Sequence, residues 1–112
     1  MVKMKNDVYR RKRGGRAQMI NIYCRNCNTN VILYQKDGIG RLHRCYFNRI
    51  FAPLHLERLQ YTGFSSLKNI PNLVCDLCNT TLGTPIIYND GRYAFHLRQG
   101  LFYKRRAHGS YE

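Results

Sequence analysis

Two copies of one short pattern, Cys-x-x-Cys-Asn-Thr, constrain this chain more than any other feature. The first copy occupies residues 24–29 and the second residues 75–80. Two residues between the thiols allow a tight turn to point both sulfurs at one ion. Two such knuckles supply four thiolates, which is a closed tetrahedral set for Zn²⁺ with Zn–S distances of about 2.3 Å. The sequence therefore predicts one structural zinc ion that joins the two halves of the chain, with the ligands Cys24, Cys27, Cys75 and Cys78.

Three other uses of paired cysteines compete with structural zinc. Disulfides need an oxidising compartment, and no secretory signal precedes the cysteines in this sequence. A redox site uses one Cys-x-x-Cys beside a strand–helix unit, whereas this chain has two matched copies. An iron–sulfur cluster also takes four thiolates, and the sequence leaves that alternative open.

The charge balance predicts an anionic partner. The chain has 112 residues, enough for one domain, and its 19 Lys and Arg outnumber 6 Asp and Glu, for a formal net charge of +13. Self-repulsion of this size opposes compaction unless an anionic partner offsets it. Nucleic acid is the expected partner, ahead of an anionic membrane, because the basic segments are not amphipathic helices. No run approaches the ~20 apolar residues of a membrane helix, and the cysteine usage indicates a reducing, cytoplasmic compartment.

The basic residues gather at both ends of the sequence. Residues 1–19 are expected to form a flexible arm, in which seven cations outnumber Asp7. Such a segment buries too little apolar surface to fold alone. We interpret the arm as an RNA-binding extension that becomes ordered on phosphate, and the alternative is a solvated tail without a specific target. A second basic cluster opens the tail at 104–112.

Residues 20–103 are expected to form one mainly β domain whose halves share one order of parts. These parts are an entry strand, a knuckle, a strand, a turn containing Asp-Gly and a return strand. In the first half they occupy 19–23, 24–27, 31–36, 37–38 and 41–47. In the second half they occupy 73–74, 75–78, 86–88, 89–91 and 92–98. Asp-Gly between strand-like runs is a hairpin signal because Gly takes the positive φ that a tight turn needs. The halves therefore resemble a decayed duplication: two knuckle-plus-hairpin units, related by a pseudo-twofold axis, that share one zinc.

The segments outside these units are expected to contain little regular secondary structure. Residues 52–72 form a connection in which Leu54, Leu56 and Leu59 predict one or two helical turns. Gly63 and Pro71 argue against a longer helix. Residues 101–103 predict a last strand.

Cys45 allows a second metal hypothesis. His43 and Cys45 lie two apart on an expected strand and so share a face. With the first knuckle they can complete a Cys₃His site, which leaves the second knuckle to bind another ion with His96 and His108. The simpler interpretation is that Cys45 is a small buried residue and that His43 and His96 lie at a sheet edge or surface.

The sequence predicts no enzymatic activity. A catalytic zinc keeps one position open for water, and four cysteines leave none. The chain has no phosphate-cradling glycine motif and no nucleophile–base arrangement. Most of the Tyr and Phe residues near the strands are expected in the core, and a minority are expected to stack on bases.

Residues around the second knuckle carry a family resemblance. The run Thr80-Thr81-Leu82-Gly83, followed by an Asp90-Gly91 turn and Arg92-Tyr93-Ala94-Phe95-His96-Leu97, resembles yippee-like domains, and residues 40–50 are similar to their Gly-Arg-aromatic strand. Those domains belong to the β-tent class, in which two sheets meet near one zinc held by two knuckles. The resemblance covers roughly residues 22–103 and implies zinc ligation by the four knuckle cysteines. Thr84 stands where those relatives carry Trp, and the chain has no Trp for a ligand cage. Small basic zinc-ribbon ribosomal proteins are the other resemblance, and they match the charge better.

We therefore expect a zinc-stabilised RNA-binding protein, either a ribosome component or a ribosome-associated factor. Its expected partners are rRNA and neighbouring ribosomal proteins. The alternatives are a β-tent module that recognises a protein or ligand, and a DNA-binding zinc-ribbon transcription factor. The candidate phosphate contacts come from both basic ends and from the strands: Lys3, Lys5, Arg10, Arg11, Lys12, Arg13, Arg16, Arg41, Arg44, Arg92, Arg98, Lys104, Arg105 and Arg106.

Overall fold

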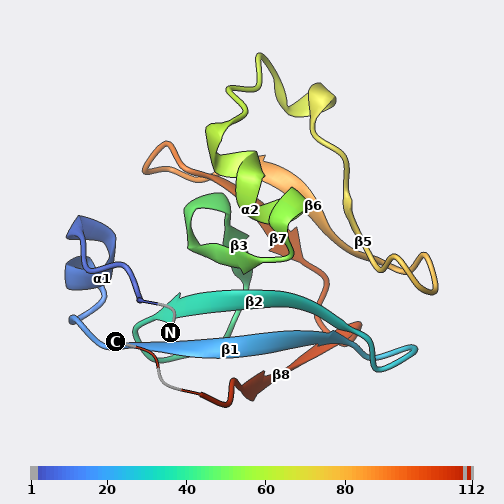
Figure 1. Ribbon diagram of the computed structural model, residues 1–112. Helices are drawn as coiled ribbons and strands as arrows, with labels where there is room; N and C mark the ends of the chain where they lie inside the picture. The colour runs from blue at the N-terminus through green and yellow to red at the C-terminus, as the bar shows by residue number, and fades with distance from the viewer. Residues whose placement is uncertain (1–2, 110, 112) are drawn as a thin grey trace.

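Two four-stranded antiparallel sheets make up the body of the protein (Figure 1). The computed structural model describes residues 3–109 and 111, so parts of the predicted arm and tail, positions 1–2, 110 and 112, lie outside it. In spatial order the first sheet contains β4 (Ile50–Ala52), β2 (Asn30–Asp37), β1 (Ala17–Cys24) and β8 (Phe102–Arg106). The second contains β3 (Arg44–Tyr46), β7 (Tyr93–Leu97), β6 (Thr81–Ile87) and β5 (Leu73–Val74). The prediction of a mainly β fold is confirmed.

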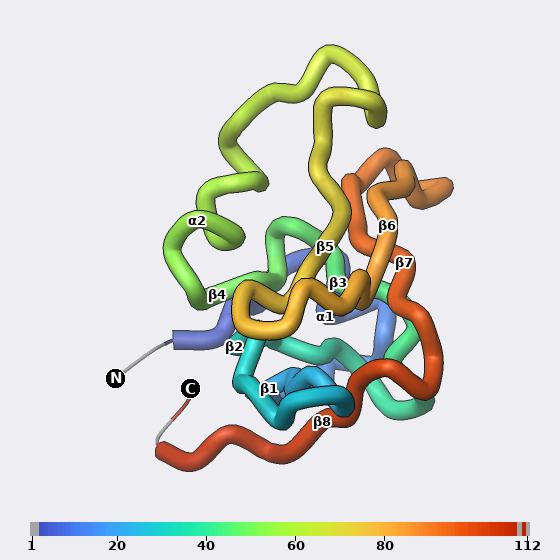
Figure 2. Tube along the Cα trace, turned by 90° about the vertical axis from the view of Figure 1, so that its right-hand side faces the viewer, coloured from blue at the N-terminus to red at the C-terminus, as the bar shows by residue number. Residues whose placement is uncertain are grey.

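Short helices fill the connections. Their bounds are α1 Val8–Lys12, η1 Phe47–Arg49, α2 Leu54–Glu57, η2 Arg58–Tyr61 and η3 Leu67–Asn69, where η marks a 3₁₀ helix. The pair α2 and η2 confirms the one or two helical turns expected after residue 52. The rest of that connection extends beyond both sheets (Figures 1 and 2). In the described part of the chain no helix has the length and apolarity needed to cross a membrane.

The core takes side chains from both sheets. Ile20, Ile22 and Ile32 of the first sheet are buried with Leu82 and Phe95 of the second. Alternation along β1 and β2 produces this burial, because every second residue points to the same face of a strand. The two knuckles lie at one end of the molecule and α1 lies at the other (Figure 1). The metal candidate and the docked N-terminal segment therefore lie at opposite ends of the molecule.

The predicted hairpin is present in the second half and absent from the first. β6 and β7 pair across the 88–91 turn, with Ile87 opposite Tyr93. β2 instead pairs with β1, through the first knuckle, and with β4. The expected return strand shortens to β3 and joins the second sheet, where Cys45 lies opposite Phe95. β4 occupies the edge of β2 that β3 was expected to fill, so the prediction of two equivalent hairpins is wrong for residues 31–47.

The N-terminal segment is ordered against the first sheet rather than extended as a flexible arm. Asp7 caps α1 by accepting from the Arg10 amide, and its carboxylate also pairs with the guanidinium of Arg49, which is 1% exposed. The Gln35 side chain accepts from the Lys5 amide and donates to the Lys5 carbonyl. The N-terminal segment docks because its acidic residue, Asp7, pairs with the buried Arg49. The sequence analysis did not predict this ion pair. Strand β1 begins at Ala17 and β8 ends at Arg106, so the regular structure runs past both predicted ends of the 20–103 domain.

A candidate four-cysteine metal centre and a cationic cleft

The two knuckles have the same backbone structure. In the first, the Cys24 amide donates to the Thr29 carbonyl at 2.9 Å and the Asn28 amide donates to the Cys24 carbonyl at 2.7 Å. The corresponding distances from Cys75 to Thr80 and from Asn79 to Cys75 are 2.9 and 2.8 Å. Asn28 and Asn79 have φ of 63° and 61°. Asn tolerates this left-handed region better than most residues, which explains why Asn follows each second cysteine.

The threonine that ends each motif contacts a sulfur. The Thr29 hydroxyl lies 3.0 Å from Cys27 Sγ, and the Thr80 hydroxyl lies 3.1 Å from Cys78 Sγ. A hydroxyl in this position can donate to a thiolate, and such outer contacts orient metal ligands and adjust their basicity. The repeated Cys-x-x-Cys-Asn-Thr thus encodes the turn and its sulfur contacts together.

The four sulfurs converge from the two halves of the chain. Cys24 Sγ lies 3.6 Å from Cys78 Sγ, and Cys27 Sγ lies 3.5 Å from Cys75 Sγ. All four lie within 4.8 Å of one another, and each cysteine is free of disulfide bonds. Tetrahedral sulfurs at about 2.3 Å from one ion are about 3.8 Å apart, which agrees with these separations. An iron–sulfur cluster places several atoms between its thiolates, so the close approach here favours a single ion.

The environment of the sulfurs is uneven. Hydrogen bonds from the side chains of Asn26 and then Thr80 lower the pKa of Cys78 to about 5. Hydrogen bonds from the side chain and then the backbone of Thr29 likewise lower the pKa of Cys27. Burial raises the pKa of Cys75 to about 11. The second cysteine of each knuckle therefore favours the thiolate that a metal requires, while Cys75 must lose a proton to bind one.

The structure does not bring Cys45 into a metal site. Cys45 is fully buried, and burial raises the pKa of its thiol far above the ordinary value. His43 and His96 are both exposed. Among residues 3–109 and 111, the four knuckle cysteines are the one group of three or more His, Cys, Asp and Glu that can hold an ion. This arrangement agrees with Cys45 as a core residue and gives the two-metal hypothesis no second cluster in those residues.

The predicted phosphate contacts divide by exposure. The exposed ones are Lys3, Arg11, Lys12, Arg13, Arg16, Arg41, Arg98, Lys104, Arg105 and Arg106. The half-buried ones are Lys5, Arg10, Arg44 and Arg92. Lys5 and Arg10 hold the N-terminal segment in place, since the Lys5 ammonium donates to Gln60 and the Arg10 guanidinium donates to the Gly15 carbonyl. These two side chains are committed to the fold.

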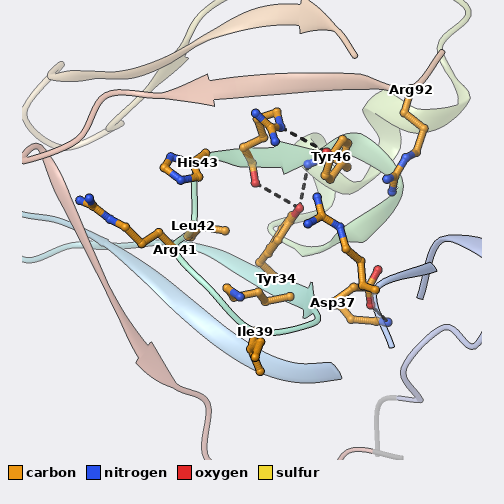
Figure 3. Close-up of a pocket in the computed structure, with 12 residues that line it drawn as sticks. Tyr34, Asp37, Ile39, Arg41, Leu42, His43, Tyr46 and Arg92 are labelled. Carbon is orange, nitrogen blue, oxygen red and sulfur yellow. Dashed lines mark hydrogen bonds between the residues drawn. The ribbon is translucent and has the colours of Figure 1, made fainter. Parts of the chain in front are cut away.

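A cleft beyond the end of β2 collects cations from separate parts of the sequence (Figure 3). It encloses about 80 Å³, and the predicted contacts that line it are Arg13, Arg41, Arg44 and Arg92. Lys36 also lines it and was missed, because it stands at the end of an apolar strand run. Its position in the strand could have indicated a buried lysine, because Lys36 shares a strand face with the buried Ile32 and Tyr34.

Aromatic residues immobilise two of the cleft arginines. The Arg92 guanidinium lies 3.7 Å from the Tyr46 ring centroid and 3.9 Å from that of Tyr9. Arg44 lies 4.4 Å above the Tyr88 ring. The buried Tyr34 hydroxyl accepts from the Tyr46 amide at 2.8 Å and donates to the Arg44 carbonyl at 3.3 Å. These contacts make a stiff wall for the cleft.

Most of the predicted core aromatics are buried: Tyr34, Tyr46, Phe47, Phe95 and Phe102. Tyr23 and Tyr103 differ, because they stack on each other at 5.1 Å and are only half-buried. Arg25 and Arg105 approach the Tyr103 ring at 5.4 and 5.5 Å. This stack lies on the face of the first sheet opposite Lys36, because Tyr23 alternates with the core residue Ile22.

No protein-family model, curated protein or solved structure matches this chain. The likeness to yippee-like domains therefore depends on the quoted motifs alone. The mainly β fold and the four converging cysteines stand on the geometry described above.

Proposed function

We propose that this protein is a zinc-stabilised RNA-binding domain that contacts the phosphate backbone through a basic face and has no catalytic role. The RNA is ribosomal or another structured RNA. The alternatives from the sequence, a DNA-binding domain and a ligand- or protein-recognition module, are treated as outcomes of the experiment below.

The observation that carries this proposal is the meeting of both basic ends at Lys36. Burial lowers the pKa of Lys36, and the nearby charges of Lys104 from β8 and Arg13 from the N-terminal segment lower it further. The charge of Asp37 offsets only part of this effect. In the described residues the ion pairs are Arg49 with Asp7 and Asp37, and Arg92 with Asp90. Of 19 Lys and Arg, only Arg49 and Arg92 take part in them. A surface of this kind attracts a polyanion.

The metal has a mechanical role in this proposal. The first knuckle joins β1 to β2 and the second joins β5 to β6, so one ion bound by all four sulfurs ties the two sheets together. Four thiolates favour zinc among biological divalent ions and leave no open coordination position. A fixed relation between the sheets holds Arg44 of β3 and Arg92, which precedes β7, at the cleft that Lys36 of the first sheet also lines. Binding then requires less ordering of the basic segments.

Salt dependence of RNA binding tests the proposal. If about eight phosphates are contacted, log K falls against log salt with a slope near −6 to −7. The double variant Lys104→Gln/Arg106→Gln should reduce the size of the slope by about 2. Arg58→Gln/Lys68→Gln removes the same charge from the connection between β4 and β5 and should leave the slope unchanged.

Two results would contradict the proposal. A slope near −1, or binding that survives high salt, would favour a recognition module with an aromatic pocket. Equal competition by duplex DNA and structured RNA would favour the DNA-binding alternative.

Co-sedimentation with ribosomes at low salt and release at high salt would identify ribosomal RNA as the target.

A further inference from the structure

The ammonium group of Lys36 lacks an anionic partner in the described structure. The residue is 6% exposed, and its Nζ donates one hydrogen bond, to the Gly38 carbonyl at 3.2 Å. An ammonium has three donors, and a buried charge is stable only when it is paired and hydrogen-bonded. The other two N–H groups have no acceptor among the described residues, and Lys36 lines the cleft.

The nearest carboxylate is already committed. Asp37 is the one acidic residue that lines the cleft. Its Oδ2 accepts from Arg49 Nε at 2.7 Å and its Oδ1 accepts from Gln35 Nε2 at 2.9 Å. Asp37 thus neutralises the buried Arg49. The cleft keeps a net positive charge.

The turn at Gly38 and the segment that follows it place two more cations, Arg13 and Arg41, at the mouth of the cleft. Gly38 has φ of +75° and its amide donates to the Arg16 carbonyl at 2.7 Å. A Cβ on Gly38 would lie 2.9 Å from Cβ of Arg13, so the absence of a side chain allows Arg13 to approach the turn. Arg41, on the segment that crosses to the second sheet, is exposed and lines the cleft, and its guanidinium is turned away from Tyr34 and Asp37 in Figure 3. Arg13 and Arg41 are thus free to close over an anion that Lys36 has bound.

We infer that this cleft binds one phosphate group, with Lys36 as the buried ligand and Arg13 and Arg41 as exposed ligands. A tetrahedral oxyanion supplies acceptors to several N–H donors at once, and guanidinium groups bind it in a bidentate manner. The small volume suits one phosphate and excludes a nucleobase, so any nucleotide lies outside with its phosphate inserted. The phosphate site itself does not depend on the proposed function, because a free phosphate or a terminal phosphate monoester has the same chemistry. Only the assignment of the bound phosphate to RNA rests on the proposed function.

Lys36→Met tests the site, because methionine keeps the aliphatic part of the side chain and removes the charge. Lys68→Met is the matched control, since Lys68 is exposed on η3 away from the cleft. The probe is inorganic phosphate, titrated against sodium chloride of equal ionic strength and followed by the urea midpoint and by ³¹P line broadening. We expect saturable binding by the wild type and by Lys68→Met, and at least a tenfold weaker affinity for Lys36→Met.

Stability without phosphate separates a binding lysine from a structural one. In chloride, Lys36→Met should unfold at the same or a higher urea concentration than the wild type, because an incompletely paired buried charge is removed. A lower midpoint for Lys36→Met together with full phosphate binding would show a structural lysine and overturn the inference. Equal phosphate affinity of both variants, or no saturable binding by the wild type, would also overturn it.

The source of the phosphate is resolved by two further ligands. A dinucleotide with one internal phosphodiester and a nucleoside 5′-monophosphate are titrated under the same conditions. Preference for the diester supports insertion of the RNA backbone, and preference for the monoester supports a chain end or a free nucleotide. If RNA binds with the expected salt slope but Lys36→Met changes neither phosphate nor RNA affinity, the inference fails and the proposed function stands. If phosphate binds through Lys36 but RNA does not bind, the proposed function fails and the site stands.

Discussion

Replacing Asp37 by alanine should destabilise the protein by about 3 kcal/mol, because Asp37 neutralises a guanidinium that water cannot reach. Arg49 is 1% exposed at its side chain, and the Asp37 carboxylate that it contacts is 8% exposed. Removing one partner from a buried ion pair costs about 3–5 kcal/mol. The lower value of this range applies here because Asp7 still contacts Arg49. Since small domains are stable by about 5–15 kcal/mol in total, this loss is large.

Two other aspartates provide charge-matched controls. Asp7→Ala removes the second partner of Arg49, but the Asp7 side chain is 36% exposed, so water offsets more of the loss. We expect about 1–2 kcal/mol, part of it from the lost cap of α1. Asp90→Ala breaks the pair with Arg92, whose side chain is 13% exposed against 1% for Arg49, so water can solvate the remaining guanidinium and the cost should be less than about 1 kcal/mol. All three variants raise the net charge by one, so general charge repulsion is the same in each.

The assay is urea denaturation of the metal-loaded protein at low salt, followed by far-UV circular dichroism and tyrosine fluorescence. The expected order of destabilisation is Asp37→Ala, then Asp7→Ala, then Asp90→Ala. If Asp37→Ala and Asp90→Ala unfold within experimental error of each other, the buried cluster around Arg49 does not organise the N-terminal segment as described.

Three further predictions concern the metal centre. Cys75→Ser, or a strong chelator, should abolish cooperative folding, because a structural zinc supplies roughly 10–16 kcal/mol of apparent binding free energy in small domains; a chelated protein with an unchanged circular dichroism spectrum and urea midpoint would refute this. Cys45→Ala should cost about 1 kcal/mol and retain one zinc per chain by metal analysis, whereas a fall in zinc content would revive a second site. Because burial raises the pKa of Cys75 to about 11, metal binding releases its proton, so the apparent zinc affinity should fall as pH falls from about 8 to 6. A competition titration with a chromogenic chelator measures this trend, and a pH-independent affinity would contradict it.

Local sequence was sufficient for the knuckles and for the second hairpin. Each knuckle is determined within six residues, since the same positions supply the ligands, the left-handed Asn and the Thr that contacts a sulfur. The turn at Asp90-Gly91 likewise specifies its strands, and β6 and β7 pair as expected. In these cases the residues that decide the structure lie next to each other in the chain.

Features that depend on distant residues were not predictable in the same way. The first Asp-Gly looks like the second, yet Asp37 pairs with Arg49 and β4 takes the edge of β2. The N-terminal segment has the composition of a mobile arm, and its docking depends on one aspartate and one buried arginine 42 residues apart. Lys36 appeared to be one more strand residue, because nothing in the local pattern shows that the segment around Arg13 and the strand bearing Lys104 will approach it. Non-local charge placement, more than strand propensity, separates the predicted structure from the observed one.

The exchange of β3 and β8 makes the two halves of the chain dependent on each other. Three strands of each sheet come from one half and the fourth from the other half, with β8 beside β1 and β3 beside β7. Neither half can complete its hydrogen-bond ladder by itself. Pairing Ile22 with Lys104 closes a loop of roughly 80 residues, an entropic cost that slows assembly. Two fragments cut within the 58–69 connection should each remain unfolded in isolation and regain structure on mixing, as one non-covalent whole.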